Sequence, residues 1–240
     1  FVINGNIYNI KDSTFIELID IESQVRVASS YTKAGKFIMT GSVKSPTSCW
    51  LITGEEYAIL QVENLKMDFQ SPDKNMRWKS VTSGGYEQSL QNQLNDLQRP
   101  YEEIASTNSK LLRDSLDIQE SKRSNIKKVI EDANKNLQNT YIQFGKTHFN
   151  SYLGLRIIYR NREEIGKDLI NNLYKKLSKE LKNTPQAEGL KIFMYERLAE
   201  IGKPIIDFNA KTFDGEHFKL SHIKGKYVYL TFGEAGCASC

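Results

Sequence analysis

The sequence predicts an α+β fold with an N-terminal antiparallel β domain, a helical region, and a short final segment of strands and turns. Three observations support this. Apolar and polar residues alternate over residues 1–82, apolar residues then recur at helical spacing, and a β-branched and aromatic run lies near the end. We expect residues 1–84 to form the β domain, 85–199 the helical region and 200–240 the final part.

The composition is that of a globular protein without a strong electrostatic bias. The 240 residues are 39% hydrophobic and 26% charged, and 33 basic against 29 acidic residues leave a net charge of +4. Because this small excess is not gathered into a long basic block, we expect no nucleic-acid partner. No apolar run approaches the roughly 20 residues that a membrane-spanning helix needs.

Period-two patterning identifies the β domain. Phe37, Met39 and Val43 alternate after the Ala34-Gly35 turn, and the series Leu65, Met67 and Phe69 repeats the pattern after another turn. Alternation with turns this closely spaced predicts an antiparallel sheet or sandwich with one face in water.

Cys49 stands apart from the other two cysteines of the chain. It lies in the apolar stretch Cys49-Trp50-Leu51-Ile52, where a buried, inert thiol is expected. The alternative is a partner role for Cys49 in disulfide exchange.

Helical periodicity begins after the breaker cluster Thr82-Ser83-Gly84-Gly85. Pro100 interrupts the first helix and is expected to kink or restart it. The apolar positions of this helix form a heptad-like seam: Leu90, Leu94, Leu97, Tyr101 and Ile104.

A second group of helices follows. Asn150-Ser151 is expected to cap a short helix that runs to Arg160, and Thr184-Pro185 to start another, which Gly202 and Pro204 end. Between these two helices one apolar face has a 3.6-residue period: Leu169, Ile170, Leu173, Tyr174, Leu177 and Leu181.

The last segment combines a strand pattern with a pair of cysteines. Tyr227 to Phe232 predicts a buried strand, and a turn of small residues leads from it to Cys237-Ala238-Ser239-Cys240. An ordered series of short segments precedes this Cys-x-x-Cys: Ile201-Gly202-Lys203-Pro204, Asp207-Phe208, Phe213-Asp214-Gly215, Leu220-Ser221 and Lys224-Gly225-Lys226-Tyr227-Val228.

This series resembles the opening of a TlpA/ResA-like thiol-disulfide oxidoreductase domain, of the broad AhpC/TSA thioredoxin-like group. The resemblance implies that residues 200–240 begin a thioredoxin-like α/β domain, in which Cys237 attacks and Cys240 resolves the mixed disulfide. The segments Phe1 to Asn9, Gly35 to Pro46 and Leu60 to Phe69 also resemble the small β domain that often precedes such domains in envelope proteins.

The resemblance further implies a cell-envelope or periplasmic location, protein thiols or disulfides as substrates, and no cofactor. The chain begins without Met and stops inside the motif. We therefore expect a targeting or membrane-anchoring segment and the rest of the thioredoxin-like domain to lie outside it, and this fragment to have little redox turnover. The rival hypothesis is a non-catalytic binding or structural module with a degenerate thioredoxin-like part.

The motif departs from the family pattern Trp-Cys-Gly-Pro-Cys. Gly236, Ala238 and Ser239 replace its Trp, Gly and Pro, and Glu234 opposes formation of a thiolate at Cys237. These departures favour the rival hypothesis slightly, whereas the two retained cysteines favour the enzyme.

Other chemistries fit the sequence less well. A zinc site at Cys237 and Cys240 would need ligands from His217, His222 or Cys49, which have no matching spacing, so no metal is expected. A Cys-His pair would use the same histidines, for which surface positions are the simpler interpretation. A peroxidase would carry Thr where Glu234 stands, whereas Thr231 lies three residues too early.

Overall fold

The computed structural model describes residues 1–115, 118–195, 201–223, 225, 227–231 and 233. The chain divides into two compact units, Phe1–Met194 and Tyr195–Cys240. The first unit holds the β domain together with its helices, and the second holds the segment that leads to the cysteine pair.

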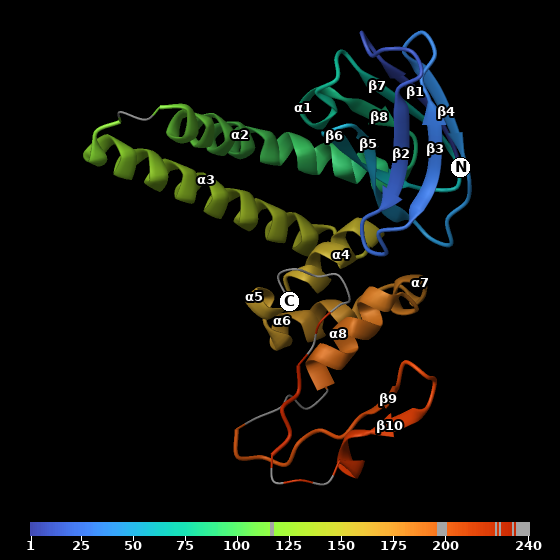
Figure 1. Ribbon diagram of the computed structural model, residues 1–240, viewed down its shortest axis with the longest axis vertical. Coiled ribbons are helices and arrows are strands. Elements are labelled where there is room, and N and C mark those ends of the chain that lie inside the picture. Colours follow the sequence, from blue (N-terminus) through green and yellow to red (C-terminus); the bar gives the residue numbers. More distant parts are fainter. Residues whose placement is uncertain (116–117, 196–200, 224, 226, 232, 234–240) are drawn as a thin grey trace. The chain divides into compact units, whose positions relative to one another are not determined.

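Within the described part of the first unit, the strands form two four-stranded sheets (Figure 1). The order of the first sheet is β4-β1-β7-β8, from Lys36–Thr40, Val2–Ile7, Lys66–Ser71 and Val81–Ser83. The order of the second is β3-β2-β5-β6, from Arg26–Tyr31, Phe15–Asp20, Thr47–Thr53 and Glu56–Val62.

The predicted α+β class is confirmed, with one refinement of the β domain. All described strand pairs of this domain are antiparallel except β1 and β7, which run parallel with Ile3 opposite Met67 and Gly5 opposite Phe69. Residues of β4 and β7 alternate between exposed and buried, as their period-two pattern predicts. The inward faces of both sheets contribute to a single hydrophobic core.

Two long helices follow the β domain and form an antiparallel pair (Figure 1). Helix α2 spans Tyr86–Asp114 and α3 spans Glu120–Thr147, while a short α1 (Met76–Lys79) precedes β8. The expected restart at Pro100 is wrong, because α2 continues through this residue. Pro100 has no N–H to donate to the carbonyl group one turn earlier. Because Pro100 is exposed, water can donate a hydrogen bond to that carbonyl instead.

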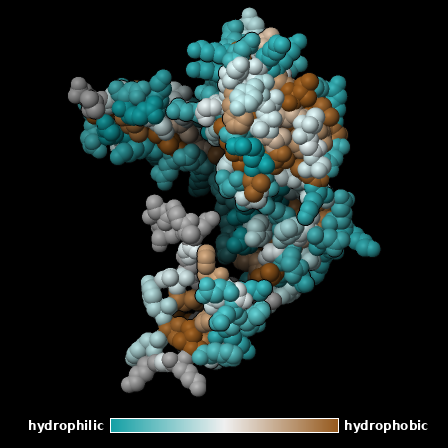
Figure 2. All heavy atoms as spheres, turned by 45° about the vertical axis from the view of Figure 1, so that its right-hand side comes forward, coloured by the Kyte–Doolittle hydropathy of each residue, from teal (hydrophilic) through white to brown (hydrophobic). Residues whose placement is uncertain are grey.

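The seam of α2 is buried only near the β domain. Leu90 and Leu94 are buried, whereas Leu97, Ile104 and Leu111 stay exposed. Accordingly, apolar residues interrupt a mainly hydrophilic surface on the paired helices in Figure 2. Among the described residues, no helix is both long enough and apolar enough to cross a membrane.

Five shorter helices complete the described part of the first unit: α4 (Tyr152–Arg160), α5 (Arg162–Ile165), α6 (Lys167–Lys175), α7 (Lys179–Lys182) and α8 (Pro185–Tyr195). The expected cap of α4 is confirmed, since Ser151 Oγ accepts a hydrogen bond from the Gly154 amide at 3.0 Å. The apolar face from Leu169 to Leu181 belongs to two helices and not one, because Ser178 begins a new helix by capping the Leu181 amide.

The described part of the second unit is a hairpin of β9 (Asn209–Lys211) and β10 (His217–Lys219), followed by a 3₁₀ turn over Leu220–His222. The apolar pair Ile205-Ile206 with Asp207-Phe208 also reads as a short strand in the sequence, but this prediction is wrong, because the first strand of this unit begins at Asn209. Residues 227–231 form no strand either, and Phe232 lies outside the described residues. A strand needs neighbours for its N–H and C=O groups, and no described strand pairs with this segment.

Candidate functional site

The predicted dithiol lies at the end of the second unit. Cys237 and Cys240 are outside the described residues, as are Glu234, Gly236, Ala238 and Ser239. The structure therefore describes part of the segment that precedes the cysteine pair and not the pair itself.

This preceding segment contains a hairpin that hydrogen bonds hold at its tip and at its base. At its tip, the Gly215 amide donates to the Thr212 carbonyl at 3.0 Å, and Gly215 has a φ of 84° that glycine adopts without steric cost. At its base, Asp207 Oδ1 accepts the Ser221 amide at 2.9 Å and Oδ2 pairs with Lys219 Nζ at 3.2 Å. Hydrogen bonds from Ser221 and then Lys219 hold the pKa of Asp207 below its usual range.

Cys49 is the free cysteine among the described residues, and it is buried as predicted. Its side chain is fully buried in β5, in the core between the sheets. Burial, followed by the neighbouring Asp20 carboxylate, raises the pKa of the Cys49 thiol to about 12. Since the thiolate is the nucleophile, Cys49 is unreactive in the folded protein.

The three histidines belong to three different elements. His217 belongs to β10 and His222 to the 3₁₀ turn, and both are exposed, while His148 ends α3 with its ring 4.3 Å from that of Phe144. No group of three or more His, Cys, Asp or Glu side chains that could hold a metal ion occurs among the described residues.

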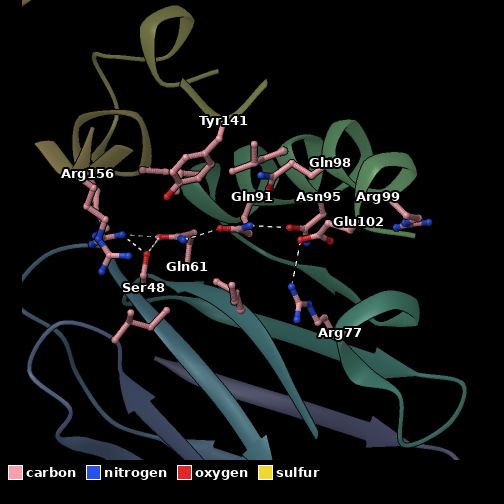
Figure 3. A pocket seen from close by; sticks show the side chains of 15 residues that line it. Ser48, Gln61, Arg77, Gln91, Asn95, Gln98, Arg99, Glu102, Tyr141 and Arg156 are labelled. Carbon is pink, nitrogen blue, oxygen red and sulfur yellow. Dashed lines mark hydrogen bonds and ion pairs between the residues drawn. The ribbon is translucent and has the colours of Figure 1, made fainter. Parts of the chain in front are cut away.

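A second candidate site is a polar pocket inside the first unit, where α2, α3 and α4 meet strands β5 and β6 (Figure 3). Its volume is about 130 Å³. Four guanidinium groups and one carboxylate line it: Arg77, Arg99, Arg156, Arg160 and Glu102.

A chain of hydrogen-bonded side chains forms the floor of this pocket (Figure 3). Ser48 Oγ donates to Gln61 Oε1 at 2.8 Å, Gln61 Nε2 donates to Gln91 Oε1 at 2.8 Å, and Gln91 Nε2 donates to Asn95 Oδ1 at 2.7 Å. Strand β6 is the edge strand of its sheet. These side-chain hydrogen bonds, together with the bond from the Gln61 amide to Gln88 Oε1, hold α2 over that edge.

Arg156, on α4, joins the same series of hydrogen-bonded side chains. Its side chain is only 8% exposed, its Nη1 donates to Ser48 Oγ and to Gln61 Oε1, and its Nε pairs with Glu22 Oε1 at 3.0 Å. The phenol oxygen of Tyr141 points into the pocket on the Arg156 side (Figure 3). Burial raises the pKa of Tyr141, and the positive charges of Arg160 and Arg156 act in the opposite direction.

Two buried or partly buried carboxylates hold the helices around the pocket. Glu63 accepts the Glu87 amide in the first turn of α2 at 3.0 Å, and Glu87 accepts the Tyr152 and Leu153 amides at the start of α4. Burial raises the pKa of Glu87, while these amide bonds act against the rise. Gly85 has a φ of 89°, and a Cβ atom there would overlap the Glu63 carboxylate.

The sequence reasoning did not identify this pocket. A signal was present in α2, where Gln88, Gln91 and Asn95 recur at spacings of three and four beside the apolar seam. The remaining members lie in β5, β6 and α4, and no local pattern connects them to α2.

The match to known families covers the β domain and the first turns of α2. Residues 1–91 match DUF4369, a domain of unknown function. No curated protein and no solved structure matches the chain. The DUF4369 match runs past Gly85 to Gln91, so it includes the helical residues that bond to the edge strand β6.

Proposed function

We propose that the protein is a cell-envelope thiol-disulfide oxidoreductase whose redox pair is Cys237 and Cys240. The observation that carries this proposal is the ordered series of segments that leads to the Cys-x-x-Cys. The hairpin of β9 and β10, closed by Asp207 and Ser221, supports it, since part of that series forms a defined structure. The substrates in this proposal are protein thiols or disulfides.

The chemistry follows from the two-residue spacing. In the reducing direction, the Cys237 thiolate attacks a substrate disulfide, forms a mixed disulfide and releases one substrate thiolate. The Cys240 thiolate then attacks Cys237 Sγ, which releases the second substrate thiolate and leaves a Cys237–Cys240 disulfide. Two electrons pass to the substrate, and the same steps in reverse oxidise a substrate dithiol.

A redox titration tests the pair. We expect that in mixtures of oxidised and reduced dithiothreitol both thiols disappear together, with the two-electron dependence of about 30 mV per tenfold change. Alkylation followed by mass spectrometry measures this on the peptide that holds Cys237 and Cys240. The native protein should leave Cys49 unlabelled throughout.

Single substitutions separate the two roles. Cys240→Ser should accumulate mixed disulfides with protein substrates in an envelope extract, whereas Cys237→Ser should not. If both variants trap partners equally, or if the pair never forms a disulfide, the non-catalytic module becomes the better hypothesis.

A further inference from the structure

The pocket shown in Figure 3 presents more hydrogen-bond donors than acceptors. Arginine can only donate, so the bond from Arg156 Nη1 fixes Gln61 with its oxygen toward Arg156. The NH₂ group of Gln61 then donates to the oxygen of Gln91, and the NH₂ group of Gln91 donates to the oxygen of Asn95. The NH₂ group of Asn95 ends the chain, and it donates to no described residue. Arg156 Nη2 likewise has no acceptor among the described residues.

One of the four arginines that line the pocket has no carboxylate partner among the described residues. Arg77 pairs with Glu102 at 3.2 Å, Arg99 with Asp96 at 3.2 Å, and Arg156 with Glu22. Arg160 lines the pocket with no carboxylate partner among the described residues. The arrangement therefore matches a ligand that carries one negative charge and additional acceptor oxygens.

The size of the pocket limits the ligand further. A volume of about 130 Å³ exceeds the space of a single water several-fold, and the walls come from strands and helices of one unit. This space suits a small molecule. A carboxylate carries one charge and fits the planar guanidinium fork, whereas inorganic phosphate carries between one and two charges near neutral pH.

We propose that this pocket binds a small organic carboxylate with a further hydroxyl or carbonyl oxygen, held by Arg160 and Arg156 Nη2. The Tyr141 hydroxyl, which points into the pocket on the Arg156 side, supplies a further polar contact. This binding site is independent of the cysteine pair and of any redox activity of the chain.

The test is an NMR titration of the full chain at constant ionic strength, which follows the side-chain amide signals of Gln91, Asn95 and Gln98. Lactate and malate are the probes, lactamide is the uncharged analogue of lactate, and inorganic phosphate is the tetrahedral anion. We expect saturable shifts with a hydroxycarboxylate and none with lactamide. No saturable shift with either carboxylate, or equally tight binding of phosphate or lactamide, would overturn the proposal.

Two variants and a matched control locate the site. Arg160→Gln removes the unpaired cation, and Tyr141→Phe removes the hydroxyl that points into the pocket. Both should bind the carboxylate at least tenfold more weakly, with an unchanged unfolding midpoint. Arg113→Gln makes the same charge change near the far end of α2, and it should bind like the wild type.

The outcomes are decisive in both directions. Wild-type affinity in both pocket variants, or an equal loss in Arg113→Gln, would show that the pocket does not hold the anion. If one variant fails to fold, the other still decides, because the two changes lie on different helices.

Discussion

At the scale of single residues, burial decides which thiol can react. Cys49 lies in the core between two sheets, beside the carboxylate of Asp20, and both features favour the neutral thiol. The neighbouring Trp50 and Leu51 in the same strand explain why an apolar run predicted this burial correctly. The reactive chemistry proposed for Cys237 and Cys240 therefore does not compete with Cys49.

The raised pKa of Cys49 gives a pH-dependent stability. The folded pKa of about 12 lies above the ordinary value of 9.0, so the fold favours the protonated thiol. The contribution is complete below about pH 9 and is lost as pH rises toward 12, at about 1.4 kcal/mol per pH unit. Urea unfolding between pH 7.5 and 10.5 under reducing conditions should show this slope as the difference between wild type and Cys49→Ala. Parallel curves for the two proteins would contradict the prediction.

At the scale of elements, carboxylates and amides at helix starts position the helices around the pocket. Glu63 holds the start of α2, and Glu87 in α2 holds the start of α4. Each helix therefore depends on an earlier, non-adjacent part of the chain for an acceptor of its first N–H groups. This relay brings Arg156 of α4 to Ser48 and Gln61, which belong to strands far away in the sequence.

Removal of the Glu87 carboxylate should weaken this connection. Glu87→Ala leaves the Tyr152 and Leu153 amides without their acceptor, and we expect the free energy of unfolding to fall by about 2–3 kcal/mol. Glu87→Gln keeps one acceptor oxygen and should lose less. Chemical denaturation measures both, with Glu131→Ala on the exposed surface of α3 as the control. A loss in Glu87→Ala no larger than that of the control would show that the caps do not hold α4.

At the scale of the whole molecule, the buried apolar residues are unevenly divided. Three hydrophobic clusters lie in the first unit, whereas Leu220 is the buried apolar residue among those described in the second. Tyr227 and Tyr229 are more than nine-tenths exposed. The first unit therefore has the core it needs to fold without the second.

A shortened chain tests this independence. Residues 1–195 alone should unfold cooperatively, with a midpoint within about 2 °C of the 240-residue chain, since the three clusters remain complete. Residues 1–161 lose much of the cluster formed by α4, α6, α7 and α8, and their midpoint should fall clearly. A non-cooperative transition for residues 1–195 would contradict the prediction.

The sequence by itself determined the features that depend on a few neighbouring residues. The alternation in β4 and β7, the Ser151 cap, the start of α8 at Pro185 and the break at Gly85 all follow from local geometry, and the structure has them. The predicted roles of Cys237 and Cys240 also rest on the sequence alone, because these residues lie outside the described part of the chain.

Only the tertiary structure decided which distant residues meet. The parallel pairing of β1 with β7 and the placement of Arg156 beside Gln61 depend on contacts between remote segments. The pocket residues look like ordinary surface residues in the sequence, because polarity alone does not show that a side chain faces a sheet edge instead of water. Hydrogen-bond partners become identifiable only when the fold brings the elements together, and the carboxylate site proposed here depends on that proximity.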